Sequence, residues 1–381
     1  MASGVGDLLR RLRDAGPTSR ADLARASGLS SAGVTKITGP LLEKGLVREQ
    51  RVEDVSAVGR PPVTLALRPN AKYVFGIHMG AERVHIGISN LLLSMSHFSK
   101  LTYRLDEPVS EVLARTVEHT RQVIKTSGLT GDQILGVGVG VPGSVDPAQR
   151  VNTHSILTDW HNVAFADVFE DALGLPTIVE HNATAIAMAE ATYGEGRSAD
   201  SILYLLLGKG IGAGFAQTGP FGRRGPVEIG HVVVAPGGPA CRCGGQGCLE
   251  RFFSEEPLRT LAGDRVVSRE DLVAAAMGSP AWPPVYQHLL QALSTTVTLL
   301  APQQIVLGGD LNTVPEDFLT ALRADLLPRV MPQQRQKLKI ARTSLPEPTG
   351  AHGAACIALE QFFYAAGPAA TARTAGQVAR A

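Results

Sequence analysis

The sequence has 381 residues, of which 44% are hydrophobic and 19% are charged, and its formal net charge is +1. This length predicts two or three domains rather than one. No apolar run reaches the ~18 residues of a membrane span, and the first residues lack the apolar stretch of a signal peptide, so we expect a cytoplasmic protein without a membrane partner.

Residues 1–72 carry a surplus of positive charge, with 12 Lys and Arg against 7 Asp and Glu. The first predicted helix has an apolar stripe over residues 8–12, and a second short helix follows. Gly28 then supplies a turn before a third helix, which Ser30 or Ser31 caps. After Gly45 the sequence alternates like a two-stranded wing. This order predicts a winged helix-turn-helix domain over residues 1–72.

The start of the third helix is the expected DNA-reading segment, with double-stranded operator DNA as its partner. Its predicted groove-facing positions are Ser31, Ala32, Gly33, Thr35 and Lys36. Arg48, Arg51 and Arg60 in the wing are expected to follow the phosphate backbone. The alternative is a three-helix module that binds another protein.

From residue 73 the pattern changes to that of an α/β protein. Residues 73–90 read as two strands that meet at glycines, and a similar signature recurs over 201–219. Two such turns in two halves of one body predict a duplicated fold with a ligand cleft between its lobes.

A cluster of cysteines distinguishes residues 241–250, CRCGGQGCLE, in a chain with only four cysteines. Together with one upstream histidine they supply the four ligands of a closed tetrahedral zinc site: His231, Cys241, Cys243 and Cys248. Four protein ligands leave no open position, so the zinc is expected to be structural. The alternative is a redox-active or incidental thiol cluster. Cys356 lies in an apolar helical pattern and is expected to be a core thiol.

Several motifs together resemble the ROK family (repressors, open reading frames and kinases). They are VPGSVDP, EHNATAIAMAE, GKGIGAGF, and EIGH followed by the cysteine motif. The resemblance extends to about residue 365 and implies an α/β actin-like (ribonuclease H-like) two-lobed sugar kinase fold over residues 73–365, with the zinc loop at 231–250. Residues 366–381 fall outside it and are expected to be disordered.

The resemblance also implies a sugar-binding site. By motif, its members are Gly143 with neighbouring Pro142, His181, Asn182, Glu228, His231 and Glu250. His231 can bind both sugar and zinc, because an imidazole has two nitrogens. For Glu228 and Glu250 the alternative is a solvated surface carboxylate.

Two departures from the family's kinases predict that catalysis is lost. His78 stands where the first phosphate loop has aspartate, and Glu82 places negative charge where phosphates would lie. Asn182 stands at the general-base position, and an amide cannot accept a proton at neutral pH. Lys209 in the second phosphate loop could still attract an anion.

The sequence therefore predicts a sugar-responsive transcriptional regulator, most readily a repressor. It is expected to bind a sugar or sugar phosphate in a kinase-like cleft that is catalytically inactive, and to act as a homodimer or homotetramer. The competing interpretation is an ATP-dependent hexose kinase with His181 as the nearest substitute base. A zinc-sensing regulator is a third, which the closed four-ligand site disfavours.

Overall fold

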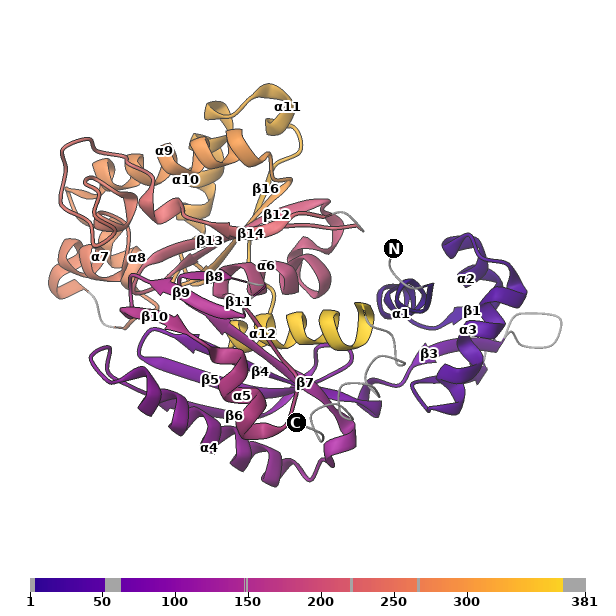
Figure 1. The fold of residues 1–381 in the computed structure, drawn as a ribbon. Helices are drawn as coiled ribbons and strands as arrows, with labels where there is room; N and C mark the ends of the chain where they lie inside the picture. The colour runs from indigo at the N-terminus through magenta and orange to yellow at the C-terminus, as the bar shows by residue number, and fades with distance from the viewer. Residues whose placement is uncertain are drawn as a thin grey trace.

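The computed structural model describes residues 4–51, 63–146, 148, 150–219, 222–265 and 268–365. A small head precedes a two-lobed body (Figure 1). Arg60 and the expected disordered segment 366–381 lie outside the described residues, as does the side chain of Arg51.

The head has the predicted helix order and one strand more than predicted. Its elements are α1 (Gly4–Ala15), β1 (Thr18–Ser19), α2 (Arg20–Ser27), α3 (Ser31–Glu43), β2 (Val47–Arg51) and β3 (Val63–Leu67). Ser30 caps α3, because its hydroxyl accepts a hydrogen bond from the N–H of Gly33. The sheet order is β1-β3-β2, so the wing carries a third strand. With only two residues, β1 is too short to leave an alternating pattern in the sequence.

The first lobe contains a five-stranded sheet of order β11-β7-β4-β5-β6 and a three-stranded sheet of order β10-β9-β8. Its elements are β4 (Tyr73–Gly80), β5 (Arg83–Asn90), β6 (Met95–Thr102), α4 (Val109–Ser127), β7 (Ile134–Val141), β8 (Ser144–Asp146), β9 (Val151–Ser155), β10 (Trp160–Val163), α5 (Phe165–Leu173), β11 (Thr177–His181) and α6 (Asn182–Tyr193).

The second lobe contains a five-stranded sheet of order β14-β13-β12-β15-β16. Its elements are β12 (Ser201–Leu207), β13 (Ile211–Gln217), β14 (Arg224–Val227), α7 (Glu255–Ala262), α8 (Leu272–Met277), α9 (Trp282–Leu300), β15 (Gln304–Gly309), α10 (Glu316–Leu326), α11 (Pro332–Arg335) and β16 (Lys339–Arg342). The chain then returns through α12 (Thr349–Leu359).

The two five-stranded sheets share one topology, which confirms the predicted duplication. In each, three antiparallel strands are followed by two parallel ones, β7 and β11 in the first lobe and β15 and β16 in the second. Ligands in such folds bind at the ends of the strands between the lobes.

Helices α6 and α12 pack against each other at the centre of the body (Figure 1). Gly353 permits this close approach, since a Cβ atom there would lie 2.7 Å from the backbone nitrogen of Ile186. Every residue of α12 is buried, as are ten of the twelve residues of α6. Among the described residues, no helix combines the length and the apolar character needed to cross a membrane.

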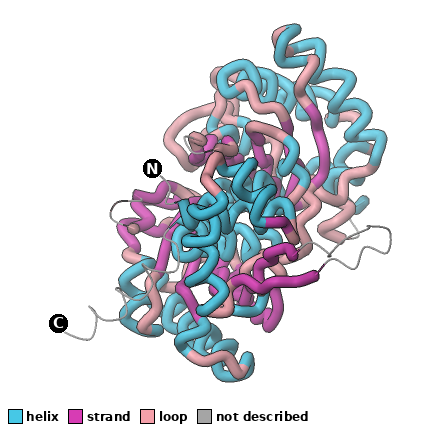
Figure 2. Tube along the Cα trace, turned by 90° about the vertical axis from the view of Figure 1, so that its right-hand side faces the viewer, coloured by secondary structure: helices cyan, strands magenta, loops and turns pink. Residues whose placement is uncertain are grey.

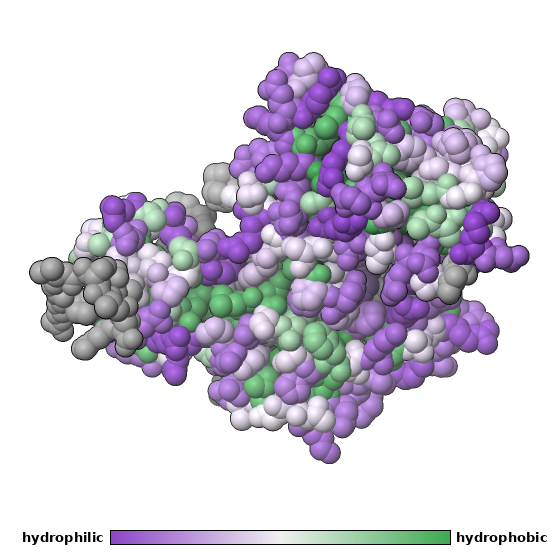
Figure 3. Space-filling model, turned by 180° about the vertical axis from the view of Figure 1, so that it is seen from behind, coloured by the Kyte–Doolittle hydropathy of each residue, from purple (hydrophilic) through white to green (hydrophobic). Residues whose placement is uncertain are grey.

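The head contacts the body through α1, which packs on a π-helical turn (Glu360–Ala365) that follows α12. Figure 2 shows the molecule from the head side, with the head nearest to the viewer. From behind, apolar surface is visible on the body close to this junction, whereas hydrophilic residues cover most of the two lobes (Figure 3).

Candidate functional site

A cleft of about 770 Å³ lies between the two lobes. All the residues predicted to bind sugar line it: Pro142, Gly143, His181, Asn182, Glu228, His231 and Glu250. They come from β7, β11, α6, the end of β14 and the zinc loop, so only the folded chain brings them together.

Asn182 begins α6 at the floor of the cleft and is 8% exposed. Its Nδ2 donates to the carbonyl of Met79 at 3.1 Å, which fixes the orientation of the amide. Its Oδ1 is buried and has no protein partner. This oxygen can accept a hydrogen bond from a ligand hydroxyl, and a neutral amide cannot take up the proton.

His181 and Gly143 border the same region. Burial lowers the pKa of His181 to about 4, so the imidazole is neutral at pH 7, and its Nδ1 lies 3.2 Å from the hydroxyl of Thr184. Gly143 has φ = +77°, and a Cβ atom there would lie 2.2 Å from the carbonyl oxygen of His154. Only glycine allows the β8–β9 hairpin to approach the cleft this closely.

The second lobe contributes two carboxylates. Glu228 is exposed and directly precedes a short 3₁₀ helix (Ile229–His231). Glu250 is half-buried and accepts a hydrogen bond from the N–H of Ile211 at 3.3 Å, so it is held against the β12–β13 loop rather than being free in solvent. Each carboxylate lies within three residues of a predicted zinc ligand.

Ion pairs occupy the part of the cleft around the loop that joins β12 and β13. The ammonium of Lys209 is 3.0 Å from Glu82 of the other lobe and 3.8 Å from Glu255. Arg269 contacts Asp310 at 2.6 Å and Glu255 at 3.9 Å. Arg259 also lies 3.2 Å from Glu255, so three cations pair with three carboxylates and their charges are balanced within the chain.

His78, near the end of β4, stacks on His85, with ring centroids 6.1 Å apart. Burial, followed by the charge of His85, lowers the pKa of His78 to about 3, and its Nδ1 is buried without a partner. The ring also abuts Gly350 at the start of α12, where a Cβ atom would lie 2.3 Å from it. The His78 ring is therefore neutral at pH 7 and held between the first lobe and α12.

Sequence reasoning missed several residues that line the cleft: His85, His154, Arg269, Asp310 and Glu347. Asp310 carried a signal, since it directly follows the glycines at the end of a predicted strand. The other four stand in no recognisable motif, and only the fold brings them to the cleft.

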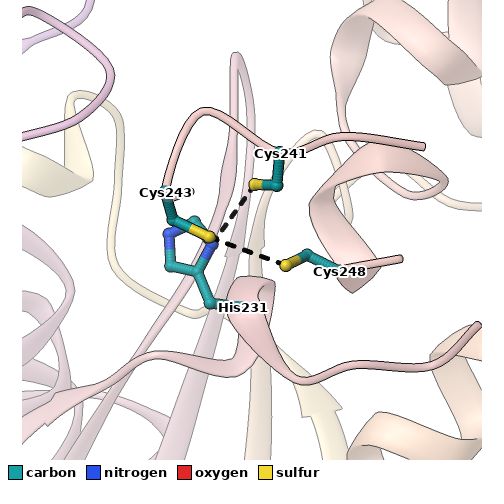
Figure 4. Close-up of side chains that lie close together, drawn as sticks. All are labelled: His231, Cys241, Cys243 and Cys248. Atoms are coloured by element: carbon teal, nitrogen blue, oxygen red, sulfur yellow. Dashed lines mark hydrogen bonds between the residues drawn. The ribbon is translucent and has the colours of Figure 1, made fainter. Parts of the chain in front are cut away.

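The four predicted metal ligands converge (Figure 4). Their ligand atoms all lie within 4.8 Å of one another. Cys241 Sγ is 3.7 Å from His231 Nδ1, and Cys243 Sγ is 3.7 Å from Cys248 Sγ. A tetrahedral zinc with Zn–S bonds of about 2.3 Å places sulfurs about 3.8 Å apart, so the cluster fits this metal.

The electrostatics of the cluster also fit a cation. Burial, followed by hydrogen bonds with the other two thiols, raises the pKa of Cys248 to about 12. A bound divalent cation would displace this proton and balance the thiolates. Gly244 and Gly247, with φ of +90° and +70°, allow the loop to close around the cluster.

The predicted DNA-reading residues lie on one accessible face of α3. Ser31, Ala32, Thr35 and Lys36 are exposed and Gly33 is half-buried, whereas Val34, Thr38 and Leu41 on the opposite side are buried in the head. Arg48 is exposed on β2. An exposed N-terminal half on the third helix is what insertion into a major groove requires.

Comparisons with known proteins agree with this arrangement. The family model described as "ROK family" matches residues 74–361, and "Winged helix-turn-helix DNA-binding" matches residues 6–48. The DNA-binding transcriptional repressor Mlc of Escherichia coli (strain K12) is 25% identical, covering 93% of this chain and 92% of that protein. The xylose repressor of Bacillus spizizenii is 26% identical, covering 93% and 94%.

Solved structures give the same result. A ROK family transcriptional regulator, described as a homologue of E. coli Mlc, aligns with a TM-score of 0.80 at 25% identity over 98% of both chains. A ROK family glucokinase from Streptomyces griseus, in complex with glucose and AMPPNP, aligns with a TM-score of 0.63 at 22% identity over 76% of this chain and shares the fold of the body. The head, the duplicated lobes and the match over residues 74–361 show that this chain belongs to the ROK family.

Proposed function

We propose that this protein is a sugar-responsive transcriptional repressor. It reads operator DNA through α3 and binds a sugar or sugar phosphate in the cleft between its lobes. The observation that carries the proposal is that one chain combines an exposed recognition helix with a cleft of the kinase fold. In that cleft, the ion pair Glu82–Lys209 occupies the place where we expect a kinase to bind phosphates. Its relatives along the whole chain are named as repressors.

The sugar is expected to meet Asn182, Glu228, His231 and Glu250, with His181 and Gly143 shaping the pocket. Asn182 Oδ1 is ready to accept a hydroxyl hydrogen bond because it is buried without a partner. The absence of a carboxylate there removes the general base, which accounts for ~10²- to 10⁴-fold in rate. The cleft is thus suited to recognition without phosphoryl transfer.

Zinc is the proposed cofactor, held by His231, Cys241, Cys243 and Cys248. When bound, it cross-links the loop at residues 231–250 and supplies no reaction. Its proposed role is to fix Glu228 and Glu250, which flank the ligands in sequence. With Nδ1 of His231 toward the thiols, Nε2 is the nitrogen left for a sugar hydroxyl.

A regulator of this kind acts in the cytoplasm as a symmetric oligomer, a homodimer or homotetramer, so that two heads read two half-sites of an inverted repeat. We propose domain limits of 1–72 for the head and 73–365 for the body. Sugar and DNA binding are then coupled thermodynamically, typically by ~1–3 kcal/mol, whichever direction the coupling takes.

The test combines calorimetry with DNA selection. A panel of xylose, glucose and N-acetylglucosamine with their phosphates is titrated into the wild type, Glu228→Ala and, as a matched control, Glu111→Ala on the exposed face of α4. Operator sequence is obtained by selecting bound duplexes from a random pool, and ATP turnover is assayed in parallel.

We expect binding of one sugar class that Glu228→Ala abolishes and Glu111→Ala preserves, selection of a defined palindromic duplex, and no sugar-dependent ATP turnover. Sugar phosphorylation would instead establish the competing function, an ATP-dependent hexose kinase. Selection of no preferred duplex would refute the regulator.

A further inference from the structure

Two central helices connect the cleft to the head. Helix α6 begins with Asn182 in the cleft, and α12 begins with Thr349 and Gly350, which also line it. Helices of 12 and 11 residues extend roughly 16–18 Å at 1.5 Å per residue. Their other ends therefore lie well away from the ligand, on the side of the body that faces α1 (Figure 1).

The C-terminal ends of both helices lie next to the same residue of the head, Arg13. Tyr193, the last residue of α6, and Tyr364, in the turn after α12, present their rings to the Arg13 guanidinium, with centroids 5.2 and 4.7 Å away. Glu360 accepts a hydrogen bond from Arg13 at 2.6 Å. The Arg13 side chain is only 9% exposed, so this contact is largely desolvated.

The surrounding contacts hold α1 against this point. Arg10 adds a second ion pair to Glu360 at 3.1 Å, and Arg197, just beyond α6, donates to the carbonyl of Asp14 at 3.3 Å. Gly6 permits direct backbone contact, since a Cβ atom there would lie 2.2 Å from the carbonyl oxygen of Tyr364. Tyr364 is in turn anchored on the first lobe by a 2.6 Å hydrogen bond to the carbonyl of Leu91.

The two helices can transmit displacement because they are rigid and buried. Close-packed helices shift as bodies rather than compress. Each helix also contacts one of the lobes. Glu190 of α6 accepts a hydrogen bond from the hydroxyl of Thr343, in the segment that joins the second lobe to α12. His78 of the first lobe packs on Gly350 at the start of α12. A change in the angle between the lobes therefore moves the ends of α6 and α12 relative to each other.

We propose that Arg13 is the residue through which the cleft controls the head. When the cleft closes on its ligand, the rings of Tyr193 and Tyr364 and the carboxylate of Glu360 change their relative positions, and Arg13 carries that change into α1. Arg13 is a positioning residue that touches neither DNA nor sugar. The inference rests on the proposed function, because it assigns the route by which sugar alters DNA binding.

Two variants of the full-length protein test this route. Arg13→Gln keeps a polar chain of similar length but removes the cation, and Glu360→Gln removes the opposite charge. The matched control is Arg11→Gln on the same helix, since Arg11 pairs within the head, with Asp7 at 2.8 Å. The dissociation constant for the selected duplex is measured with and without saturating sugar, and the sugar affinity without DNA is measured by calorimetry.

In the wild type and in Arg11→Gln, sugar is expected to change the dissociation constant for DNA by about 5- to 150-fold. In Arg13→Gln and Glu360→Gln this ratio is expected to fall below about twofold, with sugar affinity still within about twofold of the wild type. Hydrogen exchange of the α1 amides gives a second readout: sugar alters it in the wild type and leaves it unchanged in the two variants.

The outcomes separate the two proposals. A wild-type ratio that persists in Arg13→Gln overturns the role of Arg13 and leaves the repressor function intact. Sugar binding without any effect on DNA in the wild type overturns both. Loss of sugar binding in Arg13→Gln also overturns the inference, because Arg13 would then hold the body's fold rather than transmit its movement.

Discussion

A single buried imidazole illustrates how the cleft departs from a catalytic one. His78 has no partner for Nδ1, stacks on His85 and packs on Gly350, so folding keeps it neutral. Its pKa of about 3 lies far below the usual value of about 6.5. Burial therefore keeps the His78 imidazole uncharged, and the ring serves as a tight contact between the first lobe and α12.

This depressed pKa predicts a pH dependence of stability. A neutral His78 stabilises the fold fully above pH 6.5, and the contribution is lost as the pH falls toward 3, because the unfolded chain takes up the proton first. His78→Phe removes the titration, so the loss of unfolding free energy between pH 7.5 and pH 5 should be smaller than in the wild type by about 1–2 kcal/mol. Urea unfolding at the two pH values measures it.

The control is His97→Asn, at an exposed position with φ = +53° that asparagine tolerates. It should leave the pH dependence as in the wild type. An identical pH dependence in His78→Phe and the wild type would contradict a neutral His78.

At the scale of elements, the loop at residues 231–250 is a short segment whose order we expect to depend on one zinc ion. Cys248→Ser should reduce the zinc content from one per chain to near zero, measured by atomic emission, and weaken sugar binding through Glu228 and Glu250. The melting temperature should also fall by several °C, because the loop loses the cross-link that the ion supplies.

Cys356→Ala provides the matched control for this variant. Cys356 is fully buried in α12, so its truncation costs core packing but should leave the zinc content at one per chain. Full zinc occupancy in Cys248→Ser would remove Cys248 from the ligand set, whereas a wild type without zinc would favour a redox-active or incidental thiol cluster.

The recognition helix gives the second prediction at this scale. Lys36→Ala should weaken binding to all duplexes and reduce the slope of log affinity against log salt concentration by about one, because a phosphate contact is lost. Thr35→Ala should instead reduce the preference for one base pair of the operator by about 1–3 kcal/mol. Lys125→Ala, at an exposed helical lysine of α4, is the control. Fluorescence anisotropy at several salt concentrations measures both. An unchanged salt slope in Lys36→Ala would remove Lys36 from the interface.

Some of these elements could be predicted from sequence because their signals are local. The turn glycine Gly28, the cap at Ser30 and the cysteine spacing each act over a few residues, so the head's helices and the metal cluster follow from short stretches. The approach of Arg13 to Glu360 could not be predicted, because it joins residues 347 positions apart. The same holds for Glu82 and Lys209, which meet only once both lobes are folded.

At the scale of the whole molecule, an ion pair bridges the two lobes across the cleft. Lys209 of the second lobe forms an ion pair with Glu82 of the first. Because its positive charge is already paired, we expect Lys209 to attract the phosphates of a nucleotide only weakly. We therefore expect the cleft as a unit, and not Asn182 alone, to prevent catalysis.

Restoring the base alone should therefore fail. Asn182→Asp is expected to show no sugar phosphorylation in a coupled ADP-release assay, because the phosphate end still carries Glu82. Glu82→Gly, at a backbone position with φ = +64° that glycine favours, removes the nearer of the two carboxylates that pair with Lys209. It should raise the affinity for a non-hydrolysable ATP analogue in both the wild-type and the Asn182→Asp background. Glu82→Gln removes the charge without shortening the chain and should raise it less. Measurable turnover by Asn182→Asp alone would mean that the ion pair yields to nucleotide and that the missing carboxylate was the only barrier to catalysis.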